Sequence, residues 1–190
     1  MVDPDASVSM SLDRPGVPNC TAMGSLDEQA TRLEAAAGAI LDFQSRVEAR
    51  APWPMAELYG TEAEASWGPP ELLAHVEEML PFWLGEAERI LDGTAGAPVP
   101  FGRVASDAVR IGVIGRDRTI PARELFDRLE ADASRVARRM RALSDADAAK
   151  VGVHPRLGEV SVAGLFERFV TSHLEGHVDQ LREILESQGA

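Results

Sequence analysis

The stretch FERFVTSHLEGHVDQLREI, residues 166–184, holds two of the four histidines of the chain, His173 and His177. On an α-helix, residues four positions apart lie one turn apart on the same face. At about 100° per residue, both histidines fall within about 20° of the direction shared by Phe166 and Ile184. The spacing predicts that both imidazoles occupy the middle of an apolar face and point into a helical core, where polar atoms need partners.

Three further stretches have the same helical period. Together with the stretch that contains His173 and His177, they predict helices over residues 25–50, 70–91, 121–144 and 160–187. Ser25 and Glu28 have the spacing of a capping box, which starts the first helix. Pro69 and Pro70 suit the first turn of the second helix, where a missing N–H removes no helical hydrogen bond. Four amphipathic helices predict an all-α fold, a four-helix bundle.

A long crossover separates the second and third predicted helices. Residues 92–118 contain several Gly and Pro, and the run Val109–Ile114 fits either a short extended piece or a packed loop. Residues 1–22 have no helical period, and we expect a flexible leader there, with residues 23–190 as a single bundle domain. Cys20, the one cysteine, lies in that leader. It cannot form an internal disulfide, so we expect a reducing, cytoplasmic setting.

The net charge excludes several classes of partner. The chain carries −12 at pH 7 and has a pI near 4.8, whereas proteins that bind nucleic acid or anionic lipid collect Lys and Arg on one surface. No stretch approaches the roughly 18 to 20 apolar residues of a membrane span. We therefore expect neither nucleic acid nor a membrane as a partner.

A third histidine faces the same predicted core. His75 lies within about 40° of Met79 on the inward side of the second helix. Metal sites in bundles are built from side chains on facing helices, and three imidazoles plus water form an open site for zinc, nickel or iron. The alternative is that each histidine is hydrogen-bonded to a neighbouring side chain. One ion would satisfy all three imidazoles at once, which favours a metal.

Other polar residues near the predicted site fit less well. Leu174 follows His173, so the metalloprotease pattern HExxH and its glutamate base are missing. Glu86 falls on the inward side of the second helix but about three turns from His75, and we interpret it as solvated or paired with arginine. His154 is expected in the loop ahead of the last helix and not as a ligand.

Three motifs in order resemble the DinB/YfiT-like superfamily. They are Trp67-Gly-Pro-Pro-Glu-Leu-Leu-Ala-His75, His154-Pro-Arg-Leu-Gly158 and His173-xxx-His177-Val-Asp-Gln-Leu-Arg182. The resemblance covers about residues 25–187. It implies a four-helix bundle with a divalent-metal site at His75, His173 and His177, the same residues that helical spacing selects.

The resemblance also implies a class of reaction. Some members are S-transferases or isomerases that depend on mycothiol, bacillithiol or glutathione, so a small-molecule thiol and an electrophile are the expected partners. A divalent ion would lower the pKa of the thiol, and no protein nucleophile is required. Arg103, Arg110 and Arg116 on the crossover are candidates to position a substrate, although a solvated surface arginine is the favoured interpretation of each.

The competing interpretation is non-enzymatic. In it, the metal site is structural or vestigial, and the bundle serves in a stress response or binds a partner, with a homodimer formed through an exposed apolar helix face. Both interpretations include a metal, so metal content does not separate them. Dependence on a thiol does.

Overall fold

The computed structural model describes residues 24–59, 63–94 and 97–187. The expected leader, residues 1–22, and Cys20 within it lie outside the described residues. Within the described ranges, no helix is long and apolar enough to cross a membrane.

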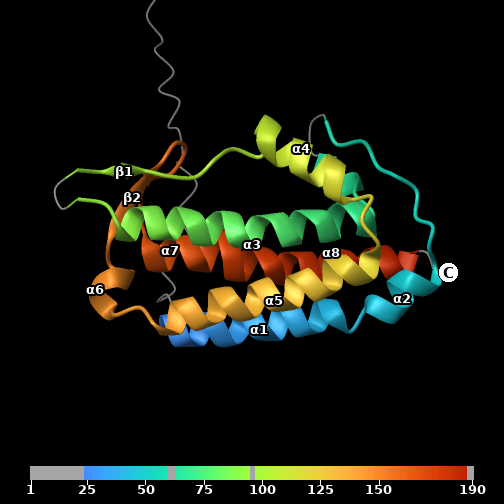
Figure 1. Ribbon diagram of the computed structural model, residues 1–190, viewed down its shortest axis with the longest axis horizontal. Coiled ribbons are helices and arrows are strands. Elements are labelled where there is room, and N and C mark those ends of the chain that lie inside the picture. Colours follow the sequence, from blue (N-terminus) through green and yellow to red (C-terminus); the bar gives the residue numbers. More distant parts are fainter. Residues whose placement is uncertain (1–23, 60–62, 95–96, 188–190) are drawn as a thin grey trace, which may run out of the picture.

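Four long helical segments pack side by side (Figure 1). They are α1 (Leu26–Leu41), α3 (Pro69–Leu91), α5 (Ala122–Arg141) and the last segment, residues 162–187, which contains α7 and α8. Helices α1 and α3 each contact both α5 and α8. Their buried side chains, among them Leu33, Leu72, Phe126 and Leu181, form one core. The predicted all-α bundle is confirmed as a class, with short helices and a small sheet added to the four long segments.

The first helix begins where the capping box predicts. Ser25 Oγ accepts from Glu28 N at 3.2 Å, and the Glu28 carboxylate accepts from Ser25 N at 2.7 Å. Its predicted extent, residues 25–50, is wrong: α1 ends at Leu41 and a separate α2 (Gln44–Ala49) follows. No Gly or Pro marks this turn. The turn lets α2 bury Val47 and contact α5, so packing decides it.

The crossover contains a helix, α4 (Ala108–Asp117), where we expected an extended piece or a loop. Asp107 caps it by accepting from Arg110 N at 3.0 Å. Its buried isoleucines, Ile111 and Ile114, are three positions apart and pack in a second small core with Trp67. The spacing of these buried residues is therefore helical, and packing against α3 stabilises the helical conformation of this segment.

A three-stranded sheet closes one end of the bundle. Its strands are β1 (Val99–Pro100), β2 (Val151–His154) and β3 (Gly158–Ser161), with β1 parallel and β3 antiparallel to β2. A short helix, α6 (Asp145–Ala148), precedes β2. Two expectations are corrected here. The last helix starts at Val162, after a strand, and His154 lies in a strand with only 5% of its surface exposed rather than in an open loop.

The last helical segment is interrupted by a π turn. It consists of α7 (Val162–Phe166), the π-helical η2 (Glu167–Thr171) and α8 (Ser172–Ser187). In one continuous α-helix, the buried residues of α7 would point about 125° away from the buried leucines of α8. These sets are Val162, Leu165 and Phe166, and Leu174, Leu181 and Leu185. A π turn adds one residue and removes about 100° of rotation, which aligns both sets with one core.

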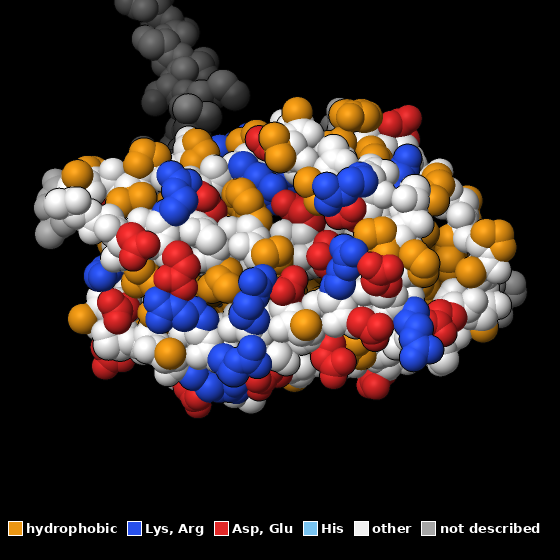
Figure 2. Space-filling view, in the orientation of Figure 1, with side chains coloured by type: hydrophobic (Ala, Val, Ile, Leu, Met, Phe, Trp, Pro, Cys, Tyr) orange, Lys and Arg blue, Asp and Glu red, His pale blue; other side chains and the backbone are white. Residues whose placement is uncertain are grey.

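The surface over α1 and α5 mixes charges of both signs. Figure 2 shows basic side chains next to acidic ones on this face, with no continuous basic patch. Arg139 pairs with Glu88 at 2.6 Å, and Arg141 pairs with Glu34 at 2.8 Å. Arginines on these helices are therefore paired with carboxylates of neighbouring helices.

Candidate metal site

The three histidines that helical spacing selected lie together. His173 Nε2 is 3.0 Å from His75 Nε2 and 3.0 Å from His177 Nε2. One ligand atom from each ring lies within 4.8 Å of the other two. His75 comes from α3, and the other two come from successive turns of α8. The contact between α3 and α8 thus assembles a triad of imidazoles.

The three imidazole rings are buried to different degrees. His75 is 3% exposed, on the same buried face of α3 as Leu72 and Met79. The prediction that His173 and His177 occupy the middle of an apolar face is wrong, because fully buried leucines occupy it. His177 lies about 60° and His173 about 100° from the centre of that face. The pair is therefore at the edge of the core, and His173 is half-buried beside a pocket.

A chain of hydrogen bonds determines which nitrogen of His177 faces the triad. Gln180 Nε2 donates to the backbone carbonyl of Glu64 at 2.7 Å, within the 3₁₀ turn η1 (Ala63–Ser66). Gln180 Oε1 therefore accepts from His177 Nδ1 at 2.9 Å. Since Nδ1 carries the proton, Nε2 keeps its lone pair toward the other histidines. Our sequence analysis missed this role, although Gln180 is in the motif that contains His177.

An arginine lies against His75. Arg110 Nη2 is 3.3 Å from Nδ1 and 3.4 Å from Nε2 of that ring, and 2.5 Å from a carboxylate oxygen of Glu64. Arg110 is 5% exposed, so the interpretation of this residue as a solvated surface arginine is wrong. Helix α4, which the sequence did not predict, brings it inside.

The surroundings keep all three imidazoles neutral. Burial, the neighbouring histidines and Arg110 lower the pKa of His75 well below its usual value. Burial, with His177 and Arg110, lowers the pKa of His173 to about 3. Burial also lowers the pKa of His177, against the opposing effects of Gln180 and Glu64. Neutral imidazole is the form that binds metal.

The donor set fits a divalent cation. Two nitrogens bound to one ion at about 2.0 to 2.1 Å lie about 2.8 to 3.4 Å apart for angles of 90° to 109°. The observed separations of 3.0 Å from His173 to both partners agree with this range. His173 Nε2 faces two ring nitrogens at once and carries at most one proton to share between them, whereas one cation would accept a lone pair from all three rings. The three histidines could therefore hold a divalent metal.

The triad opens into a pocket of about 290 Å³. His75 and His173 line it, together with Arg103, Arg110 and Arg168. Arg103 pairs with Glu78 at 2.5 Å and lies 3.6 Å above the Phe82 ring, so the interpretation of Arg103 as a solvated arginine is also wrong. Within the described parts of the chain, Arg168 has no carboxylate partner. The pocket thus places an unpaired positive charge beside the histidines.

A second pocket adjoins the first. Its volume is about 540 Å³, and the two share the wall residues Glu64, Val104, Ala105 and Arg110. Leu58, Trp67 and Ile111 give it a mainly apolar lining, and Arg156 adds a positive charge. The Arg110–Glu64 pair therefore lies between the chamber at the histidines and the chamber at Trp67.

Other candidate residues lie outside the triad. Glu86 pairs with Arg89 at 2.7 Å and accepts from Gly102 N, which confirms the arginine-paired interpretation of this carboxylate. His154 stacks on Phe169, a wall residue of the pocket at the histidines, at 5.1 Å between ring centroids. The Arg116 side chain is 72% exposed and pairs with Asp117. These residues support the crossover and the pocket wall, and none joins the histidines.

Comparison with known proteins is consistent with this geometry. A family model described as the DinB superfamily matches residues 25–181, which is most of the chain. The match begins at the N-cap of α1 and ends within α8, so it includes all three histidines. A search of curated proteins found no match.

Proposed function

The chain belongs to the DinB superfamily, and from this membership we propose that His75, His173 and His177 together bind one divalent ion. The observation that carries the proposal is the convergence of three neutral imidazoles beside an open pocket, with His173 Nε2 3.0 Å from Nε2 of both other rings. Three nitrogen ligands with room for water or substrate suit zinc, nickel or iron.

The reaction that this site supports best is transfer or isomerisation that depends on a low-molecular-weight thiol of the mycothiol type. A bound divalent ion supplies a Lewis acid that lowers the pKa of a thiol. In a transfer, the sulfur would form a bond to an electrophilic carbon while the leaving group departs with its electron pair, and the thiol proton would pass to water. No cysteine of the chain is needed.

The chain's own residues would bind and orient the two reactants. Arg168, which has no carboxylate partner among the described residues, would hold an acidic group of the thiol or of the electrophile at the histidines. The adjoining chamber at Trp67 and Ile111 would take an apolar part and exclude water from it. Arg110 lines both chambers, so it would lie between the two reactants.

Replacement of single histidines tests the metal site. In protein purified with zinc, His75→Ala, His173→Ala and His177→Ala should each lose most of the metal found by elemental analysis and keep their helical circular dichroism. His154→Ala is the control. It should keep the metal, although it loses the stacking on Phe169. Full zinc content in all three triad variants would refute the site.

Thiol dependence tests the reaction. After cobalt substitution, mycothiol, bacillithiol and glutathione are added one at a time while the visible spectrum is recorded, and turnover is then assayed with a panel of electrophiles. A spectral change with one thiol, and turnover that needs both that thiol and the metal, would support the transferase. A metal-loaded protein that shows neither a spectral change nor turnover with any of the thiols would contradict the transferase proposal.

The competing proposal is a bundle that binds a partner or a second copy of the chain. It draws on large apolar side chains that remain exposed near α4 and the segment before α3, namely Met55 (53%), Tyr59 (69%) and Val109 (72%). A concentration-dependent dimer in sedimentation experiments, weakened by Val109→Ser, would favour it. A monomer at every concentration would count against the dimer.

A further inference from the structure

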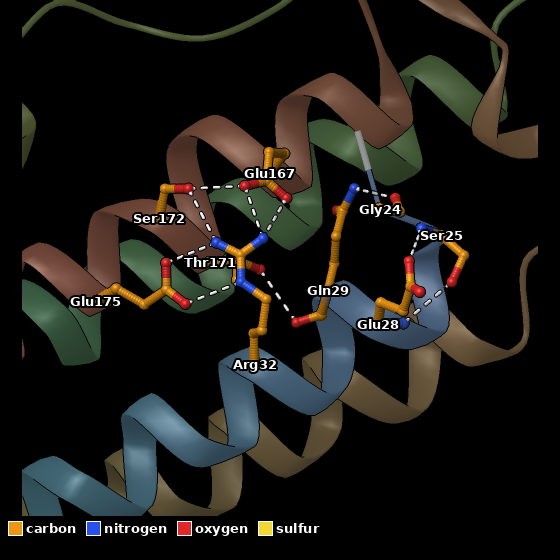
Figure 3. Close-up of polar contacts among 9 residues, drawn as sticks. All are labelled: Gly24, Ser25, Glu28, Gln29, Arg32, Glu167, Thr171, Ser172 and Glu175. Carbon is orange, nitrogen blue, oxygen red and sulfur yellow. Dashed lines mark hydrogen bonds and ion pairs between the residues drawn. The ribbon is translucent and has the colours of Figure 1, made fainter. Parts of the chain in front are cut away.

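Arg32 of α1 bridges two parts of the last helical segment that the π turn η2 separates (Figure 3). Its Nη1 donates to both carboxylate oxygens of Glu167 at 2.9 and 3.0 Å. Its Nε and Nη2 donate to the carboxylate of Glu175 at 2.9 and 2.6 Å. Glu167 begins η2, and Glu175 lies in the first turn of α8. One guanidinium therefore holds the helix on both sides of the turn.

Two further contacts connect the same place to α1. Ser172 Oγ donates to Glu167 at 2.8 Å and also lies 3.4 Å from Arg32 Nη2. Thr171, which is fully buried, donates to the backbone carbonyl of Gln29 at 3.4 Å. Gln29 and Arg32 are neighbours on one face of α1, so a single turn of α1 contacts both the first and the last residue of the π turn.

The rotation of α8 about its own axis depends on this turn. A π turn contains one residue more than an α turn. Replacing one by the other changes the direction of all side chains that follow in the helix by about 100°. His173 comes directly after Ser172. A nitrogen about 6 Å from the helix axis moves by about 1 Å for each 10° of rotation. A site with 3.0 Å separations tolerates little of that motion.

We propose that Arg32 is a positioning residue for the histidine triad, acting through the π turn without touching a histidine. The proposal rests on the metal site proposed above. By bonding to Glu167 and Glu175 at the same time, Arg32 sets the rotation of α8 at which His173 Nε2 reaches His75 and His177. The bidentate geometry carries the effect, since a lysine would keep the charge and lose the planar fork.

A second arginine offers a matched control. Arg141 of α5 binds the carboxylate of Glu34 on α1 through two nitrogens at 2.8 Å each, and its side chain is exposed to a similar degree, 34% against 41% for Arg32. It also joins two helices, α5 and α1, and none of its hydrogen bonds or ion pairs among the described residues reaches α8. Loss of either arginine removes one partly exposed ion-pair network, which alone contributes little to stability.

The experiment compares Arg32→Lys with Arg141→Lys in the full chain. Zinc affinity is measured by competition with a chromophoric chelator, the cobalt form by its visible spectrum, and stability by thermal melting. Arg32→Lys should bind zinc about 3- to 10-fold more weakly, less than the roughly 10- to 100-fold that follows loss of a partner bonded directly to a ligand. It should also shift the cobalt spectrum. Arg141→Lys should change neither, and the two melting temperatures should be similar.

A metal-free readout separates this proposal from the one on which it rests. Nitrogen and proton NMR shifts of the His173 and His177 rings report the triad without an ion. If wild-type protein binds no zinc, the metal site fails, yet Arg32→Lys should still change these ring signals and Arg141→Lys should not. Equal zinc affinity and unchanged ring signals in Arg32→Lys, or equal changes in both variants, would overturn the positioning role.

Discussion

Two of the three histidines have different neighbours at Nδ1. His177 Nδ1 donates to Gln180, whereas His75 Nδ1 faces the Arg110 guanidinium. A donated Nδ1 proton orients the ring and makes Nε2 a better ligand, while a nearby cation opposes a second positive charge. Arg110 is itself neutralised by Glu64. At the scale of single residues, Glu64 therefore serves the triad twice, through its carboxylate at Arg110 and its carbonyl at Gln180.

Gln180→Leu should weaken zinc binding about 10- to 100-fold, because His177 loses the acceptor that keeps its proton on Nδ1. The control is Gln44→Leu, since within the described part of the chain the Gln44 side chain bonds only to Glu48, on the surface of α2. Isothermal titration with zinc is the measurement. An affinity equal to that of the wild type in Gln180→Leu would show that the Gln180 contact does not tune the ligand.

The metal-free protein should lose stability as pH falls from 7 to 5. The pKa values of His75, His173 and His177 are lowered by burial, so below about pH 6.5 the unfolded chain takes up protons that the folded chain does not. Each histidine that stays neutral should contribute a slope of about 1.4 kcal/mol per pH unit. Glu77, whose pKa is raised by burial, acts in the opposite direction.

Urea unfolding at several pH values measures this slope. His173→Gln should show a shallower dependence of the free energy of unfolding on pH than the wild type, because one of the titrating groups is gone. Paired carboxylates such as Glu88 and Asp117 have lowered pKa values and affect stability only at more acidic pH. A free energy of unfolding that is constant between pH 7 and 5 would contradict neutral, buried imidazoles.

At the scale of elements, the π turn reconciles two apolar stripes that differ by about one residue in phase. Burial of Phe166 before the turn and Leu174 after it depends on the extra residue between them. The same residue sets the direction of His173. The regular hydrogen-bond pattern of the α-helix is thus interrupted beside the candidate site. Such π turns are often found at functional sites.

Single-residue deletions test this account. Deletion of Arg168 should leave a continuous α-helix with both stripes still aligned, and should change the free energy of unfolding little. Asp179 is an exposed residue in the regular α-helical part of α8, which has no extra residue to absorb a deletion. Its deletion should rotate Leu181 and Leu185 by about 100° out of the core and lower the free energy of unfolding by several kcal/mol. Chemical denaturation measures both. Equal losses in the two deletions would show that the turn is not a phase correction.

At the scale of the whole molecule, the core does not depend on the ion. Most of the buried side chains of the four long segments are apolar and pack on each other, and the two histidines of α8 lie at the edge of this core. A chain of this length buries enough apolar surface to fold without a metal. The site is therefore suited to exchange or open coordination, in contrast to a structural zinc site.

Removal of the metal with a chelator should leave the helical circular dichroism at 222 nm unchanged. The melting temperature should fall, since a ligand at 100 times its Kd stabilises the folded state by about 2.7 kcal/mol. Calorimetry with and without zinc measures the difference, and His173→Ala should show none. Loss of helical signal on chelation would mean that the ion is structural.

Much of this protein follows from local pattern. The capping box of Ser25 and Glu28, the four amphipathic stretches and the inward phase of His75 are properties of neighbouring residues, and the structure has all of them. Spacing of four positions was also enough to put His173 and His177 on one face. Helical period is a short-range property of the backbone, so these features could be predicted from the sequence.

Tertiary contacts decided the rest. The break at residues 42–43, helix α4 and the π turn each depend on which surface the chain packs against, and no local signal specifies that surface. The burial of Arg110 and His154 and the contact of Gln180 with Glu64 join residues far apart in sequence. Their free energies arise from desolvation and pairing in the assembled core, so only the folded structure could reveal them.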